Sequence, residues 1–294
     1  MILVVLSLPT LSLAQEDDSA DVLFDVTKEM DTKYGNPTVQ ERLLTALDEA
    51  EIRYEFTPEN VTLDELFLED YKILVIWDPE GTYSEAEKLA IYEFVDNGGM
   101  LLFLGTSFFD TVQVVFDDLN DLLSPYGIQL VKERMIDLTN YFGCTCGTTP
   151  VVSNLVDESY FYNIDEIALR HTMRLEITEP AFAIAMGDED AFIDLNFNEK
   201  VDEGELVGDI PVMAQRNMEN GGVVIVFGTE KIFENTSIHL ADNEKLAINI
   251  FSDFISDYNS RPVNEDSSMM YYMLGGIAAV VIIVAIVLFA KKGK

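Results

Sequence analysis

Hydrophobic and polar positions alternate along the first half of the chain in blocks that predict strands and helices in turn. Short, almost wholly apolar runs at 22–26, 73–77 and 100–104 are separated by longer segments in which apolar residues recur every three or four positions. Fully apolar runs are typical of strands buried on both faces of a parallel sheet. The longer period is typical of amphipathic helices. This order predicts an α/β fold with a doubly wound, mostly parallel sheet of the flavodoxin type.

Local signals mark where the helices of this predicted fold begin and end. Asn36 before Pro37 can cap a helix, because Pro fits the first helical turn. Ser84 with Glu87 has the spacing of a capping box. A helix beginning there would end at Gly98-Gly99. A strand predicted at 128–131 continues the series.

The pattern becomes irregular between about residues 133 and 215. Short apolar runs with acidic turns between them predict an antiparallel, β-rich insertion. The first pattern then returns, because ENGGVVIVFGTEKIFEN at 219–235 repeats the layout of DNGGMLLFLGTSFFD at 96–110. Both have an acidic turn, Gly-Gly, an apolar strand, Gly-Thr and an aromatic residue. With an amphipathic helix expected at 240–254, the domain is predicted to span 21–257.

The two ends of the chain have the composition of targeting segments. The apolar run 1–14 closes on Ser-Leu-Ala, which predicts a secretory signal peptide; a buried first strand is the alternative. The uncharged run 269–290 is long enough to cross a bilayer. Lysines in the tail 291–294 place that tail in the cytoplasm. We therefore expect a type I single-pass membrane protein whose domain lies outside the cytoplasm on a short stalk, 258–268.

The charge of the chain is strongly negative. It has 53 Asp and Glu against 18 Lys and Arg, a formal net charge of -35. Such a surface repels nucleic acid and excludes it as a partner. It suits a salty medium or bound divalent cations, although plain solubility explains most of the charge. Together with the secretory layout and the sparse cysteines, it favours an archaeal source.

Two small motifs bear on the extracytoplasmic location. Asn60 and Asn235 begin N-x-Ser/Thr sequons and are candidate glycosylation sites. Cys144 and Cys146 form no disulfide framework. They are predicted to be a local or intermolecular disulfide or two free thiols. A metal site would need a histidine from elsewhere in the chain.

Ser107 is the one candidate nucleophile. It follows the apolar run 100–104 where class I glutamine amidotransferase-like folds carry a nucleophile elbow. A serine nucleophile needs a base, an orienting carboxylate and an oxyanion hole. Bulky Phe108 follows it, and the only histidines are His171 and His239. Ser107 is therefore predicted to cap the segment after the strand, with a serine hydrolase as the alternative.

The acidic stretch DLNFNEKVDEGE at 194–205 has the spacing of a twelve-residue calcium loop. Oxygen-bearing positions 1, 3, 5, 7, 9 and 12 are Asp194, Asn196, Asn198, Lys200 through its carbonyl, Asp202 and Glu205. Calcium takes about six to eight such oxygen ligands. Position 6 is Glu199 instead of the usual glycine, and a strand is expected before the loop. The stretch is either a calcium site or an acidic hairpin turn, and no other cofactor is predicted.

Two stretches carry a resemblance to a known domain: LVIWDPEGTYSEAEKLAIYEFVDNGGMLLFLG at 74–105 and PVMAQRNMENGGVVIVFGTEKIFEN at 211–235. Together they resemble the catalytically inactive amidotransferase-like domain called GIFT. That domain occurs in a non-catalytic oligosaccharyltransferase subunit, an intraflagellar transport protein and auxiliary proteins of gliding-motility ABC transporters. The resemblance implies an α/β fold without catalytic residues and other membrane-protein subunits as partners. The oligosaccharyltransferase subunit has a further β-rich region where this chain has only its stalk.

These observations predict a membrane-anchored, non-catalytic binding or scaffold domain, an accessory subunit of a membrane complex. A free-standing surface domain that binds calcium or a glycan is the alternative.

Overall fold

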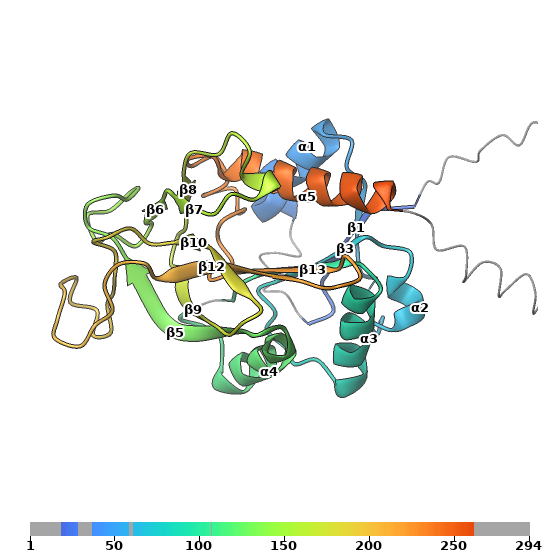
Figure 1. Cartoon of the computed structure of the whole chain (residues 1–294), viewed down its shortest axis with the longest axis horizontal. Coiled ribbons are helices and arrows are strands. Elements are labelled where there is room, and N and C mark those ends of the chain that lie inside the picture. The colour runs from blue at the N-terminus through green and yellow to red at the C-terminus, as the bar shows by residue number, and fades with distance from the viewer. Residues whose placement is uncertain (1–18, 29–36, 59–60, 107, 262–294) are drawn as a thin grey trace, which may run out of the picture. The chain divides into compact units, whose positions relative to one another are not determined.

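The structure is a computed structural model that describes residues 19–28, 37–58, 61–106 and 108–261 (Figure 1). The chain divides into two units, 1–258 and 259–294. The predicted signal peptide, transmembrane segment and tail, and most of the stalk, lie outside the described residues, as do Ser107 and Asn60. Among the helices that the structure describes, none combines the length and apolar character needed to cross a membrane.

The first unit is built on an eight-stranded sheet with the order β2-β1-β3-β4-β13-β12-β10-β7 (Figure 1). Its first five strands run parallel, and the last three are antiparallel to their neighbours. The strands are β2 (Tyr54–Phe56), β1 (Val22–Asp25), β3 (Ile73–Trp77), β4 (Met100–Leu104), β13 (Val223–Phe227), β12 (Pro211–Asn217), β10 (Phe182–Met186) and β7 (Asn154–Leu155). The prediction of a mixed α/β fold with a mostly parallel sheet is confirmed.

Helices cover both faces of this sheet, because its central strands are apolar on both sides. Along β3 and β4 the side chains alternate between two buried clusters: Val75 and Leu102 belong to one, Ile76 and Leu101 to the other. The first cluster lies under α1 (Pro37–Glu49) and α5 (Asn243–Ser260). The second lies under α2 (Glu65–Leu68), α3 (Glu85–Asp96) and α4 (Gln113–Leu123). Figure 1 shows these two helical layers on opposite sides of the sheet.

Ser84 caps α3 as its spacing predicts. Its side chain accepts from the backbone N–H of Glu87, whose carboxylate accepts in return from the Ser84 N–H at 2.8 Å. The exchange satisfies two N–H groups that the first helical turn leaves without partners.

The strand expected at 128–131 does not continue the parallel sheet. Instead β5 (Ile128–Ile136) pairs antiparallel with β9 (Met173–Ile177) and with β11 (Phe192–Ile193) in a second, three-stranded sheet. The physical reason is visible in its burial: Ile128 and Leu130 are buried, whereas Gln129 is exposed. A strand with one solvent-exposed face suits an antiparallel sheet, whereas the central strands of a parallel sheet are buried on both faces.

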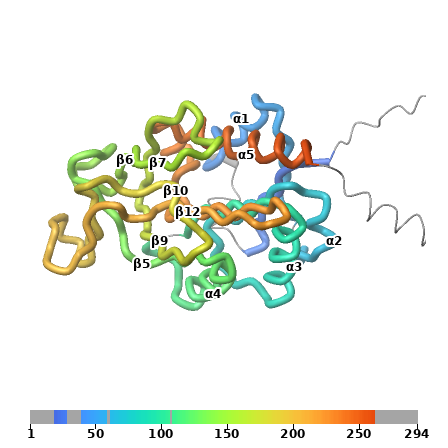
Figure 2. The backbone as a smooth tube through the Cα atoms, viewed as in Figure 1, coloured from blue at the N-terminus to red at the C-terminus, as the bar shows by residue number. Residues whose placement is uncertain are grey.

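The β-rich section beyond β5 is also irregular in the structure. It holds a small sheet of β6 (Val151–Val152) and β8 (Ile167–Ala168). Two short 3₁₀ turns, η1 (Ser124–Tyr126) and η2 (Ser159–Phe161), lie before and within the section. Figure 2 follows the backbone through this section from β5 to β12.

The two similar sequence segments lie side by side. β4 and β13 pair in parallel, with Met100 opposite Val223 and Leu104 opposite Phe227. The Gly-Gly turns therefore meet at one edge of the sheet and the Gly-Thr corners at the other. A Cβ at Gly222 would collide with the carbonyl oxygen of Val95, which explains why this turn needs glycine.

Candidate functional site

The carboxyl ends of the parallel strands form the edge at which doubly wound sheets bind their ligands. Here the two Gly-Thr corners close that edge. Gly105 has a left-handed backbone, φ +47, and a Cβ on it would lie 2.7 Å from the Thr229 nitrogen and 2.8 Å from the Glu230 nitrogen. Trp77, at the end of β3, donates from Nε1 to the Glu230 carbonyl oxygen at 2.7 Å. The backbones after β4 and β13 are thus packed directly on each other.

The polar side chains at this edge are bonded to one another. Asp25, at the end of β1, accepts from the Tyr83 hydroxyl at 2.7 Å. Burial, followed by the Asp25 carboxylate, raises the pKa of Tyr83 well above its ordinary value. Thr106 donates to Asp78 at 3.2 Å and lies 2.5 Å from the Thr111 hydroxyl. These groups hold the edge together.

Glu230 and Lys231 bring a buried ion pair to the corner. The Glu230 side chain is 1% exposed, and its Oε1 lies 2.7 Å from Lys231 Nζ. Burial raises the pKa of Glu230. Burial opposes the charge of Lys231, but the Glu230 carboxylate outweighs it and raises the pKa of the lysine. The sequence motif Gly-Thr-Glu-Lys contains no signal that this pair is buried; its depth follows from the packing of the two corners.

Of the two histidines proposed as bases, only His171 lies near the segment that follows Ser107. Its ring centroid is 5.8 Å from that of Phe109, whereas His239 is exposed. His171 has a left-handed backbone, φ 54, and its buried Nδ1 has no partner among the described residues. Burial, reinforced by Arg170, lowers its pKa to about 4. A histidine with this pKa is neutral near pH 7 and is a weak general base.

An open groove with a volume of about 660 Å³ is lined by His171. Two arginines, Arg134 and Arg170, lie along it, together with the loop that holds Cys144 and Cys146. These cysteines form a local disulfide, one of the alternatives that their spacing predicts. The groove therefore places two arginines, one of them paired with Asp194, beside the Cys144–Cys146 loop in a chain of strongly negative charge.

The predicted calcium loop is a closed, hydrogen-bonded turn. Asn196 and Asn198 each donate from Nδ2 to the same Asp202 oxygen at 2.6 Å. Glu205 accepts from the backbone N–H of Leu195 at 2.9 Å and of Asp202 at 2.8 Å. The structure brings these acidic and amide groups into one turn, as their spacing predicts.

Two features separate this turn from a standard calcium loop. Asp194, the first predicted ligand, is buried and pairs with Arg134 at 3.1 Å. Glu199 at position 6 has a left-handed backbone, φ 58, where glycine is usual. The side chain of Lys200, which is expected to contribute only its carbonyl, is exposed. Calcium binding by this loop stays a prediction, and the arginine opposes it.

The remaining predicted site residue is Asn235. It is half-buried, and its Oδ1 accepts from the Arg42 N–H on α1 at 2.9 Å.

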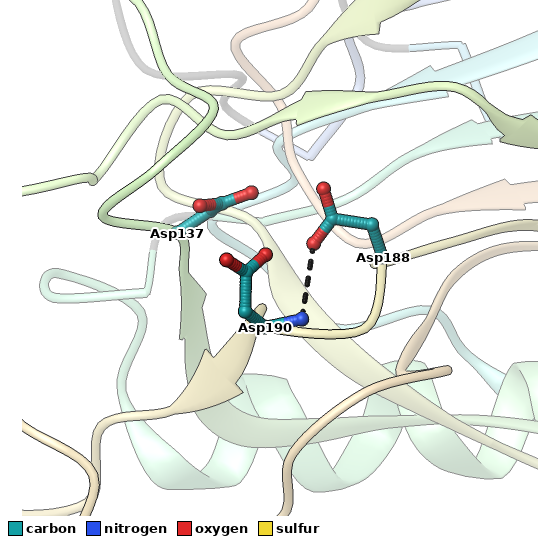
Figure 3. A group of neighbouring side chains, drawn as sticks. All are labelled: Asp137, Asp188 and Asp190. Carbon is teal, nitrogen blue, oxygen red and sulfur yellow. Dashed lines mark hydrogen bonds between the residues drawn. The ribbon is translucent and has the colours of Figure 1, made fainter.

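A further acidic cluster has no counterpart in the sequence motifs. One carboxylate oxygen from each of Asp137, Asp188 and Asp190 lies within 4.8 Å of the others (Figure 3). The residues come from two segments that are distant in sequence, so linear spacing could not have revealed them.

No protein-family model matches the chain, and no curated protein matches its sequence. Solved structures do match. The mmIFT52 N-terminal domain is 18% identical with a TM-score of 0.61, and the match covers 80% of this chain and 96% of that one. The cytoplasmic protein STM1381 from Salmonella typhimurium LT2 is 14% identical with a TM-score of 0.51, covering 74% and 87%. At these identities the similarity shows the fold alone: the chain is a mixed α/β domain of this architecture.

Proposed function

We propose that this protein is a membrane-anchored, non-catalytic binding domain outside the cytoplasm, of the GIFT type. It serves as an accessory subunit of a membrane complex that resembles an oligosaccharyltransferase or an ABC transporter. The observation that carries the proposal is the contrast between the closed corner at Gly105 and the open groove beside it. A catalytic elbow needs space around its nucleophile, whereas a docking surface needs an accessible face.

The chemistry around the corner supports binding. The neighbouring Thr106 hydroxyl is already engaged with Asp78 and Thr111. His171 has a low pKa, and within the described residues no carboxylate is hydrogen bonded to its ring. An activated serine would need both a competent base and an orienting acid.

The groove and the adjoining Phe109 supply the proposed docking face. Arg170 provides positive charge beside the groove, Arg134 is paired with Asp194 at 3.1 Å, and Phe109 is 58% exposed. Aromatic and arginine side chains are the residue types that contribute most to protein interfaces. The membrane span expected at 269–290 would hold this face near other membrane proteins.

A site-specific photo-cross-linking experiment tests this function. A benzophenone amino acid replaces Phe109 in the full-length protein in native membranes, and Leu89 is the matched control. Leu89 lies on α3 and is also 58% exposed. We expect the Phe109 probe to capture a polytopic membrane protein that mass spectrometry identifies, with no capture from Leu89. Equal capture from both positions, or none from either, would contradict the proposal.

The hydrolase alternative has its own test. A fluorophosphonate probe should leave the wild-type protein unlabelled. Labelling that disappears in Ser107→Ala would show a serine nucleophile and overturn the non-catalytic assignment.

A second candidate function is a free-standing surface domain that binds calcium or a glycan. The observation in its favour is that Glu199 of the 194–205 loop lines the same groove as the arginines. Calcium at the loop would then alter one wall of the groove. A calcium-dependent rise in melting temperature that is lost in Glu205→Gln would support this function.

A further inference from the structure

Three aspartates meet where β5 ends beside the turn between β10 and β11. The register of the strands brings them together: Ile136 of β5 pairs with Phe192 of β11 in antiparallel fashion. Asp137, the next residue after β5, is therefore opposite the turn that carries Asp188 and Asp190. Figure 3 shows the three carboxylates converging from these two segments. One oxygen of each lies within 4.8 Å of the others.

Asp137 is held rigidly in this arrangement. Its Oδ1 accepts from the Thr139 N–H at 2.7 Å, the Thr139 hydroxyl at 2.9 Å and the Asn140 N–H at 2.9 Å. Its backbone N–H donates to the Gly147 carbonyl oxygen at 3.1 Å. The carboxylate therefore has a fixed position before any ligand arrives.

The other oxygen of Asp137 has no such partners. The residue is 1% exposed, and Oδ2 is buried with no hydrogen-bond partner in the part of the chain that the structure describes. An ionised oxygen taken out of water without a partner is costly. A native fold seldom leaves such a group unsatisfied unless an ion or ordered water completes it.

No described lysine or arginine forms an ion pair with any of the three aspartates, although the structure holds such pairs elsewhere. Asp188 uses Oδ1 to accept from the Ala191 N–H at 3.1 Å. Three carboxylates this close repel one another unless a cation or a proton separates them.

We propose that Asp137, Asp188 and Asp190 bind a calcium ion through their carboxylate oxygens, at a site separate from the 194–205 loop. One oxygen of each aspartate lies within 4.8 Å of the others, close enough to share one ion. The preference for calcium follows from the ligands: calcium takes carboxylate oxygens in flexible geometry, whereas magnesium demands near-ideal octahedral geometry. Water would complete the coordination on the side of Asp190, which is exposed. The site does not depend on the proposed function.

The test is calcium titration of the purified full-length protein after removal of divalent ions with a chelator. Isothermal titration with calcium chloride, and separately with magnesium chloride, measures the affinities. Because Asp137→Asn changes a buried group and endangers folding, the main variant is Asp190→Asn, which changes an exposed side chain. Asp157→Asn alters another exposed aspartate with no described partner and is the matched control. Asp202→Asn reports on the 194–205 loop.

We expect wild-type protein to bind calcium, with at least a tenfold loss of affinity in Asp190→Asn and none in Asp157→Asn or Asp202→Asn. Calcium at a hundred times its dissociation constant should raise the melting temperature by about 5 to 10 °C. The proposal is overturned if wild-type protein binds no calcium, if Asp190→Asn binds it unchanged, or if magnesium binds more tightly. Loss confined to Asp202→Asn would place the ion in the loop instead.

Discussion

Strand β11 separates two acidic regions whose carboxylates differ in their bonding partners. After it, three carboxylates of the 194–205 loop have partners: Asp194 pairs with Arg134 of β5, and Asp202 and Glu205 accept from N–H groups within the loop. Before it, Asp188 and Asp190 face Asp137, whose Oδ2 is buried without a described partner. The region with the recognisable motif is the one in which Asp194, Asp202 and Glu205 already have ion-pair or hydrogen-bond partners.

The comparison separates two requirements of a metal site: its ligand oxygens must lie close together, and they must not already be bonded to other groups. Linear spacing shows which side chains can meet within one turn, as it does for Asn196, Asn198 and Asp202. It does not show whether their oxygens already have bonding partners. For the aspartate cluster the reverse holds: strand register brings the three residues together without a linear motif, and Oδ2 of Asp137 has no partner among the described residues.

The largest effect should come from breaking the ion pair that joins Asp194 of the loop to Arg134 of β5. Arg134→Met leaves the Asp194 carboxylate, whose side chain is 0% exposed, buried without its counter-charge. We expect a loss of about 3 to 5 kcal/mol in the free energy of unfolding, measured by urea denaturation. The control Arg174→Met removes a more exposed pair with Glu133 and should cost at most about 1 kcal/mol. Equal losses would mean that Arg134 does not compensate Asp194.

A smaller effect should follow from disturbing the support of the aspartate cluster. Gly147 has φ +64, and a Cβ on it would collide with the Asp137 carbonyl oxygen. Gly147→Ala should lower the free energy of unfolding by about 2 to 4 kcal/mol, since it adds left-handed strain and a clash. Gly143 has φ +83 with open space around it. Gly143→Ala should therefore cost only about 1 kcal/mol, the strain alone.

The Gly147 comparison also tests the cluster as a calcium site. Only Gly147→Ala should weaken calcium binding, because a Cβ at Gly147 would press on the backbone of Asp137, whereas one at Gly143 would meet open space. A similar cost and an unchanged affinity for both variants would contradict the proposed support.

The smallest effect is a difference in pH response. Without calcium, the pKa of Asp188 is raised above its ordinary value of 3.8. Asp188 therefore contributes its full share to the free energy of unfolding below pH 3.8, and this share is lost as the pH rises through the raised pKa. Hydrogen bonds from Asn196 and then Asn198 lower the pKa of Asp202, so its contribution is present above 3.8 and lost as pH falls through the lowered value. For Asp188 the change should stay below about 1 kcal/mol, because the group is only partly buried and solvent screens its charge.

Melting curves between pH 3 and 6 measure this difference. Asp188→Asn and Asp202→Asn should alter the pH dependence in opposite directions, and calcium should abolish the Asp188 effect. Parallel changes in both variants would remove the distinction between the two regions.

The central architecture could be predicted from the sequence because it depends on local pattern. The apolar runs of β3 and β4, the capping box at Ser84 and the repeated Gly-Gly segments each act over a few residues. The position of β5 could not, since its first residues are apolar enough for either sheet. Its partner, β9, lies far along the chain, and the solvent-exposed face of β5 at Gln129 favours this antiparallel pairing.

The candidate sites divide in the same way. The turn of the 194–205 loop was predictable because its contacts are local. The closed corner at Gly105, the groove at His171 and the cluster around Asp137 each depend on segments that only the tertiary fold brings together.

The pairing of β4 with β13 also sets the order in which the sheet can be completed during synthesis. β13 occupies the place beside β4 in the middle of the sheet, yet roughly 120 residues separate them, or about 6 to 24 s of translation. For that interval the growing chain has β4 as an open edge, with unpaired backbone groups that invite pairing with other chains. A nascent chain of this protein therefore needs protection, from a chaperone or from the translocation machinery, until Val223–Phe227 has been synthesised and pairs with β4.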